Sequence, residues 1–63
     1  MDIKKIRQAL FLTQVEFAKK LEVDVSSVSF WEVGKYKPTL KHQRKIIEIC
    51  QENKLDIKDF IKK

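Results

Sequence analysis

The sequence predicts a small all-α domain, and three features of the chain support this prediction. Its 63 residues include one glycine, Gly34, and one proline, Pro38, so little interrupts a helix. Apolar residues recur three and four positions apart, which is typical of helices with one buried face. Residues that cap helices precede several of these segments, and no segment alternates apolar and polar residues as a strand would. We expect a single domain over residues 1–63, because a chain of this length is too short for two.

The first two helices are expected at about 3–10 and from residue 14 to about residue 21. The spacing of three apolar residues predicts the first helix: Ile3, Ile6 and Leu10. Thr13 can cap the second helix, with Glu16 three residues later as its capping-box partner. Phe17 is expected at the flank of the apolar stripe that the second helix buries. This predicted stripe is Val15, Ala18 and Leu21.

Three more helices are expected after residue 23. The third begins at Asp24 or Val25, turns Val28 and Trp31 inward and ends at Gly34. Thr39 caps the fourth helix after a loop over residues 35–38. Its predicted apolar stripe is Leu40, Ile47 and Cys50, with Ile46 and Ile49 beside it. Asp56 caps a short fifth helix with three apolar residues, Ile57, Phe60 and Ile61. Lys62 and Lys63 are expected to form a frayed end.

The charge of the chain is strongly basic and unevenly spread. Lys and Arg number 14 against 9 Asp and Glu, which gives a formal charge of +5. Residues 33–47 hold five basic residues and no acid, whereas the charged residues of segment 22–32 are all acidic. A basic stretch inside a folded chain favours a surface that faces a polyanion. A solvated helix face explains the same stretch equally well.

Several classes of protein are excluded or disfavoured by composition. A single cysteine, Cys50, and a single histidine, His42, cannot form an internal disulfide or a structural zinc site, so we expect no metal and no cofactor. No Ser-His-acid set or glycine-rich phosphate loop can be argued, and we expect no enzyme. The longest uncharged run, residues 9–15, is too short for a bilayer. No signal-peptide pattern follows Met1, and we expect a cytoplasmic protein without membrane contact.

The segment 14–34 has the pattern of a helix-turn-helix. Two short helices are separated by about three residues, and Ala18 is small enough for them to cross closely. The second helix would bury Val28 and Trp31 and leave a polar face free. The major groove of double-stranded DNA admits one helix, and the second helix of such a pair enters it.

Four stretches carry a specific family resemblance: Leu12-Thr13-Gln14, Phe17-Ala18-Lys19-Lys20-Leu21, Val28-Ser29-Phe30-Trp31-Glu32 and Gly34-Lys35-Tyr36-Lys37-Pro38. In these stretches the chain resembles the Cro/cI-type (XRE) helix-turn-helix family of small phage repressors and bacterial regulators. The resemblance runs from about Ile3 to Phe60. It implies a compact five-helix, lambda-repressor-like domain that binds operator DNA, usually as a symmetric dimer.

The resemblance also implies roles for individual residues. Base edges would be faced by Val25, Ser26, Ser27, Ser29 and Phe30. Phosphates would be contacted by Gln14, Lys35 and Lys37. Beside these positions, we also expect phosphate contacts from Thr13 and from Tyr36, for which covering the core is the alternative. Arg7 and Glu32 match a structural ion pair between the first and third helices. The apolar residues of the last helix would supply both core and a small two-fold interface: Ile57, Phe60 and Ile61. The chain would then be a monomer or weak homodimer that pairs on DNA.

The chain departs from the family pattern at four places. Phe11 and Glu22 stand where the family usually has turn glycines, and Phe11 is expected in the core or against a partner. A non-glycine residue in left-handed conformation costs about 1–2 kcal/mol, so either these turns are strained or their shape differs. Val33 occupies a site that is often polar. The link between the fourth and fifth helices, at residues 51–54, is about three residues longer.

The expected function is a sequence-specific DNA-binding transcriptional regulator, a repressor of phage or mobile-element type. Its third helix lacks Arg, Lys, Asn and Gln, so we expect modest direct readout with a preference for T-rich positions, aided by DNA shape. The alternative is a protein-interaction module, an antitoxin or phage accessory factor, which the acidic segment 22–32 favours. A non-specific architectural protein is a third hypothesis.

Overall fold

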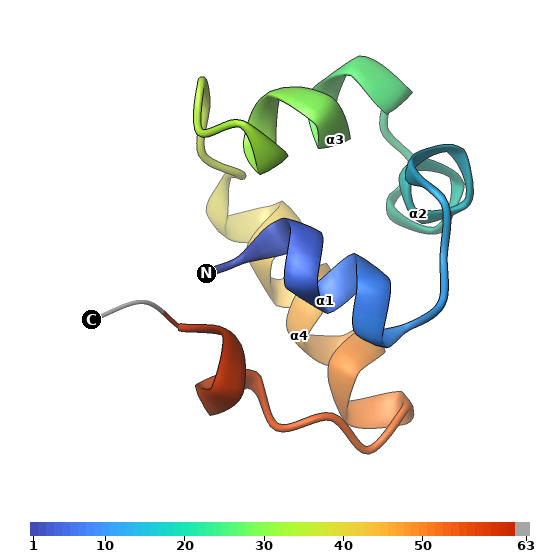
Figure 1. The fold of residues 1–63 in the computed structure, drawn as a ribbon, viewed down its shortest axis with the longest axis vertical. Helices are drawn as coiled ribbons and strands as arrows, with labels where there is room; N and C mark the ends of the chain where they lie inside the picture. Colours follow the sequence, from blue (N-terminus) through green and yellow to red (C-terminus); the bar gives the residue numbers. More distant parts are fainter. Residues whose placement is uncertain (62–63) are drawn as a thin grey trace.

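The computed structural model describes residues 1–61, and the chain folds there into four α-helices and one short 3-10 helix (Figure 1). The elements are α1 (Ile3–Ala9), α2 (Gln14–Leu21), α3 (Val25–Glu32), α4 (Leu40–Glu52) and η1 (Ile57–Phe60). Residues 1–61 contain no strand, so the prediction of an all-α domain is confirmed. The expectation for Lys62 and Lys63 lies outside the described residues.

Three of the expected helix caps form as the sequence predicts. Thr13 Oγ1 accepts from the Glu16 N–H at 3.1 Å, and Glu16 Oε1 accepts from the Thr13 N–H at 2.9 Å. This complete capping box fixes the start of α2. Thr39 caps α4, and Asp56 caps η1 by accepting from the Lys58 N–H at 3.0 Å. Asp24 stands at the N-cap of α3, but its side chain forms no capping hydrogen bond.

The fifth element is one turn of 3-10 helix instead of an α-helix. It has only four residues, and the Asp59 N–H donates to the Asp56 carbonyl at 3.1 Å, which is the i to i+3 spacing of this helix type. The Asp2 N–H donates to the Phe60 carbonyl at 2.6 Å and ties η1 to the start of α1.

The core lies where the four α-helices meet. Its wholly or almost wholly buried residues are Ile3, Ile6, Phe17, Ala18, Leu21, Val28, Ile46, Ile49 and Cys50. Burial raises the pKa of the Cys50 thiol above its usual value. Trp31, expected in the core, is partly buried and packs at its edge. In Figure 1 α3 forms the upper edge of the molecule, and η1 lies on the lower side of the molecule.

The predicted stripe of α2 was wrong at Val15 and Phe17. Phe17 is wholly buried, whereas Val15 is 52% exposed. The residues of α2 that meet α3 and α4 are Phe17, Ala18 and Leu21, at the i, i+1 and i+4 positions of one helix face. Val15 lies two residues before Phe17, which is about 200° around the helix and therefore on the other side.

The predicted stripe of α4 was also wrong at its start. Leu40 is 71% exposed, and the buried face consists of Ile46, Ile49 and Cys50, with Ile47 half-buried. Leu40 is the first residue of the helix, and all buried residues of α4 lie from Ile46 onward. The spacing of apolar residues alone does not show which part of a helix is covered by neighbouring elements.

Both turns that lack the family's glycine still adopt the left-handed conformation. Phe11 has φ 58° and Glu22 has φ 59°, and Lys54, in the longer link after α4, has φ 58°. The turns therefore keep their shape in spite of the residue types. Phe11 is 93% exposed, so a core position was wrong, and contact of Phe11 with a partner stays a prediction. Gly34, with φ 80°, follows α3 as predicted.

None of the helices within residues 1–61 has both the length and the apolar character that a bilayer span demands. Within the same residues, no three His, Cys, Asp or Glu side chains gather as metal ligands would.

Candidate nucleic-acid interface

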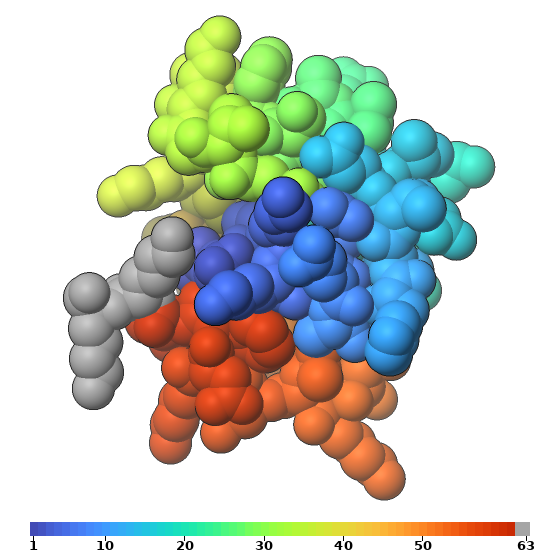
Figure 2. All heavy atoms as spheres, viewed as in Figure 1, coloured from blue at the N-terminus to red at the C-terminus, as the bar shows by residue number. Residues whose placement is uncertain are grey.

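Helices α2 and α3 form a helix-turn-helix whose turn is residues 22–24. The Val23 N–H donates to the Ala18 carbonyl at 3.0 Å and closes the end of α2. Val28 is wholly buried and holds α3 on the core, with Trp31 partly buried behind it. In Figure 2 the atoms of α3 and of the loop that follows it make up the upper end of the molecule. Helix α3 therefore packs on the core through Val28, and the side of α3 opposite Val28 faces outward.

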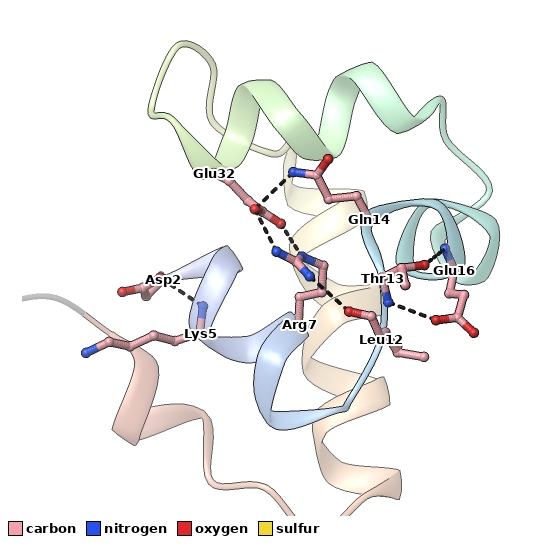
Figure 3. Close-up of polar contacts among 8 residues, drawn as sticks. All are labelled: Asp2, Lys5, Arg7, Leu12, Thr13, Gln14, Glu16 and Glu32. Carbon is pink, nitrogen blue, oxygen red and sulfur yellow. Dashed lines mark hydrogen bonds and ion pairs between the residues drawn. The ribbon is translucent and has the colours of Figure 1, made fainter.

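An ion-pair network joins the start of the helix-turn-helix to its end (Figure 3). Arg7 donates through Nε and Nη2 to the two carboxylate oxygens of Glu32, the second at 3.1 Å. Arg7 Nη1 donates to the Leu12 carbonyl at 3.0 Å, and Gln14 Nε2 donates to Glu32 Oε1 at 3.1 Å. Because Glu32 accepts from both α1 and α2, the network fixes the last turn of α3 relative to both helices.

The charged groups of this network are nearly withdrawn from water. The side chains of Arg7 and Glu32 are 15% and 5% exposed. Desolvation raises the pKa of Glu32, but the hydrogen bonds from Arg7 and Gln14 and the charges of Arg7 and Lys4 outweigh it, so the pKa lies below its usual value. The hydrogen bond to Glu32 raises the pKa of Arg7. Glu32 is therefore ionised at neutral pH.

The five residues expected to face bases lie along α3 with different degrees of exposure. Val25 and Ser26 are exposed, and Ser27, Ser29 and Phe30 are half-buried. Ser26, Ser29 and Phe30 lie three and four positions apart, so they share the side of α3 that faces away from Val28. Val33 is exposed and continues this line one turn further. The outward side of α3 therefore carries hydroxyl groups at its start and apolar groups at its end.

The residues expected to contact phosphate lie in two places. Thr13 and Gln14 start α2, and both already have hydrogen-bond partners, in the capping box and in the Glu32 network. The Thr13 hydroxyl can still donate its proton, and Gln14 has a second amide hydrogen. Lys35, Tyr36 and Lys37 are exposed in the loop after α3. This loop supplies cations beside a helix that has none.

Sequence reasoning missed a cluster in which Phe30 contacts two loop residues. The Lys35 Nζ lies 4.8 Å from the centre of the Phe30 ring and 5.7 Å from that of the Tyr36 ring. The two rings meet edge to face, with centres 5.5 Å apart and an angle of 81°. The aromatic and basic residue types were visible in the sequence. Their contact depends on the path of the loop, for which the sequence offered no signal.

The residues expected at a dimer contact lie in η1 and directly after it, and Figure 1 shows η1 on the lower side of the molecule. Ile57 and Phe60 are half-buried and pack against the core, whereas Ile61 is 52% exposed. The element η1 packs on α1 and α4. Two of the three side chains thus serve the core of this chain, and Ile61 is the most available for another.

In this helix-turn-helix the second helix packs on the core, its opposite side faces outward, and a basic loop follows it. This is the arrangement of a DNA-binding domain. Residues 3–57 match the helix-turn-helix family of the Cro/cI (XRE) type, and the chain belongs to this family of DNA-binding transcriptional regulators. The family is typically non-enzymatic. Comparisons with curated proteins and with solved structures gave no match.

Proposed function

We propose that the chain is a sequence-specific repressor of the phage or mobile-element type that inserts α3 into the major groove of double-stranded operator DNA. One observation supports this most directly: the outward side of α3 begins with exposed Val25 and Ser26, and an exposed basic loop follows the helix. A helix in the groove with cations beside it over the phosphates is how such domains dock. Repression would follow from occupying a promoter. This role needs no catalytic group, cofactor or metal.

Each contact between a side chain of α3 and a base is weak in this proposal. Ser26 and Ser29 each offer one flexible hydrogen bond, and Phe30 and Val25 offer apolar contact to thymine methyl groups. Residues 25–32 contain no side chain that can pair bidentately with guanine or adenine. Direct readout therefore favours T-rich positions, and the deformability of the DNA supplies further specificity.

Phosphate contacts in this proposal position the helix. Lys35, Tyr36 and Lys37 contact one strand from the loop, and Thr13 and Gln14 contact the backbone across the groove. The Glu32 network supports this role of Gln14, because it holds the amide at the start of α2. Neutralised phosphates release counterions, so binding should weaken steeply with salt.

Two copies would bind one operator as a weak or DNA-induced homodimer. Exposed Ile61 beside half-buried Ile57 and Phe60 supplies a small apolar contact at the end of the described chain. An interface of a few side chains is too small for a stable dimer in solution. DNA would then bring the copies together.

A second candidate function is a protein-interaction module, an antitoxin or phage accessory factor that keeps the fold. The turn between α2 and α3 favours it, because Glu22 and Asp24 are exposed and acidic beside the proposed DNA surface. Exposed Phe11 offers an apolar contact for a protein partner. Such a module would bind DNA weakly and with little dependence on salt.

The proposal is tested by selecting duplexes from random DNA and measuring Kd for the best duplex and a scrambled one at several salt concentrations. We expect a palindromic duplex that binds at least about 10³-fold tighter than the scramble. Phe30→Ala should cost more on the selected duplex than on the scramble. Phe11→Ala, which removes the same ring from a turn outside α3, is the matched control and should change neither Kd.

Three results would count against the proposal. If Phe30→Ala loses the same factor of affinity on both duplexes, Phe30 does not contribute to base recognition. A steep salt dependence without an enriched sequence would mean binding to the backbone alone. Failure to bind any duplex would favour the interaction module.

A further inference from the structure

We propose that Lys35 is a positioning residue that holds Phe30 against Tyr36, and that Phe30, so held, reads one thymine methyl group in the operator. We call these three side chains the aromatic cluster. This inference rests on the proposed function, because it assigns a substrate feature to the same surface. It narrows the apolar contact of Phe30 to one thymine methyl group and gives Lys35 a role other than a simple phosphate contact.

The geometry of the aromatic cluster is specific. The Lys35 N–H donates to the Phe30 carbonyl at 2.9 Å, so the chain turns back directly after α3. This turn brings the Lys35 ammonium group over the Phe30 ring at 4.8 Å and over the Tyr36 ring at 5.7 Å. One cation thus lies near two rings that already meet edge to face.

The expected effect of the cluster is to restrict the rotation of Phe30. A half-buried aromatic ring at the end of a helix would otherwise sample several rotamers, and binding DNA would have to fix one of them. A cation on its face and a second ring beside it favour one orientation before DNA is bound. A ring that is already oriented loses less entropy on contact.

The chemistry of the cluster fits thymine among the four bases. The thymine methyl is the one apolar group that bases present in the major groove, and a phenyl ring is a suitable partner for it. An ammonium group beside the ring also suits a position next to the phosphate backbone. Because Lys35 can donate protons away from the rings, it can contact a phosphate while it holds Phe30.

Deoxyuridine tests the methyl contact, because it differs from thymidine by this group alone. Each thymine of a selected half-site is replaced in turn, and Kd is measured for wild type, Phe30→Leu, Lys35→Met and Lys35→Arg. Burial of one methyl group predicts that wild type loses about fourfold in affinity at one position. Lys35→Met should lose little at that position, and Phe30→Leu, which keeps an aliphatic group but not the oriented ring, should lose less than wild type. Lys35→Arg should keep the loss, since a guanidinium also binds aromatic faces.

Lys37→Met is the matched control, because Lys37 is an exposed lysine of the same loop. It removes the same charge, so it should weaken binding to the thymine and uracil duplexes by the same factor. If Lys35→Met also weakens both equally and leaves the methyl effect intact, Lys35 is only a phosphate contact and the positioning role is refuted. If no single thymine shows the effect in wild type, the proposed contact of Phe30 with a thymine methyl group is refuted. Sequence-specific binding by the chain would not be refuted by that result.

A measurement on the free protein separates this inference from the proposed function. Side-chain protons of Lys35 that lie over a ring should show upfield NMR shifts, and Phe30→Leu should reduce these shifts. Normal shifts in wild type would refute the cluster even if the chain binds an operator. Shifted protons in a chain that binds no specific duplex would instead refute the proposed function and the contact with a thymine methyl group, and leave the cluster as a feature of the fold.

Discussion

Replacing Phe11 by glycine should stabilise the domain, although it removes a large aromatic side chain. Phe11 adopts φ 58°, a conformation that disfavours residues with a Cβ atom. Its side chain is 93% exposed, so its loss removes almost no buried area. Its N–H donates to the Gln8 carbonyl at 3.0 Å, and glycine keeps this hydrogen bond.

The magnitude follows from two opposing terms. A left-handed residue with a Cβ atom costs about 1–2 kcal/mol, and glycine removes this cost. Glycine is also more flexible in the unfolded chain, which lowers the gain by about 0.5–1 kcal/mol. We therefore expect a net stabilisation of up to about 1.5 kcal/mol, with a middle value of about 0.75 kcal/mol, at which Tm rises by about 3–6 °C for a domain of this size.

Urea denaturation followed by circular dichroism measures this change, with Phe11→Ala as the control. Alanine removes the ring but keeps the Cβ atom, so it should change the free energy of unfolding by less than about 0.5 kcal/mol. Equal effects of glycine and alanine would show that backbone strain at Phe11 is negligible. A loss of more than about 1 kcal/mol in alanine would mean that the ring has a structural partner.

Four further predictions concern the ion-pair network, the core and the second strained turn. Glu32→Gln should destabilise the fold by about 2–3 kcal/mol in urea, since it leaves the Arg7 charge half-paired in a nearly buried site; a change below about 0.5 kcal/mol would show that the pair is not coupled to folding. The folded pKa of Glu32 is lowered, so its contribution to stability is present above its unfolded pKa near 4.5 and is lost as pH falls through the folded pKa. The free energy of unfolding of wild type should therefore fall more steeply below about pH 4.5 than that of Glu32→Gln, and parallel curves would contradict this assignment. Phe17→Ala should lower the free energy of unfolding by about 3–5 kcal/mol, and Val15→Ala should lower it by less than about 1 kcal/mol. The reverse order in thermal unfolding would mean that Val15, and not Phe17, is buried. Glu22→Gly should raise Tm and, by removing a negative charge near the proposed DNA surface, tighten binding to both selected and scrambled duplexes; unchanged Kd values would place the turn away from the DNA.

Local features of the fold could be predicted from the sequence because each depends on neighbouring residues. The Thr13 and Glu16 capping box needs two residue types three positions apart, and Gly34 marks the end of α3 by its own conformational freedom. The segment 14–34 could be assigned because its two helices and their turn are contiguous. The capping and turn signals act within about one helical turn, and the helix-turn-helix lies in one continuous segment.

Other features depend on contacts between distant segments and could not be predicted from spacing. Phe17 and Val15 are both apolar, and which of them is buried depends on where α3 and α4 lie. The contact of Lys35 with Phe30 depends on the direction of the chain after α3. The pairing of Arg7 with Glu32, 25 residues apart, was suggested by family resemblance and not by any periodicity.

The central claim is that α3 is the surface that contacts DNA, and amide chemical-shift mapping tests it most directly. The selected duplex is titrated into the labelled chain, and the shift of every backbone N–H is followed. We expect the largest changes in α3, at Gln14 and in the loop that holds Lys35 and Lys37, with small changes near Phe11. Changes centred on Phe11 or on η1, with α3 unaffected, would contradict the claim.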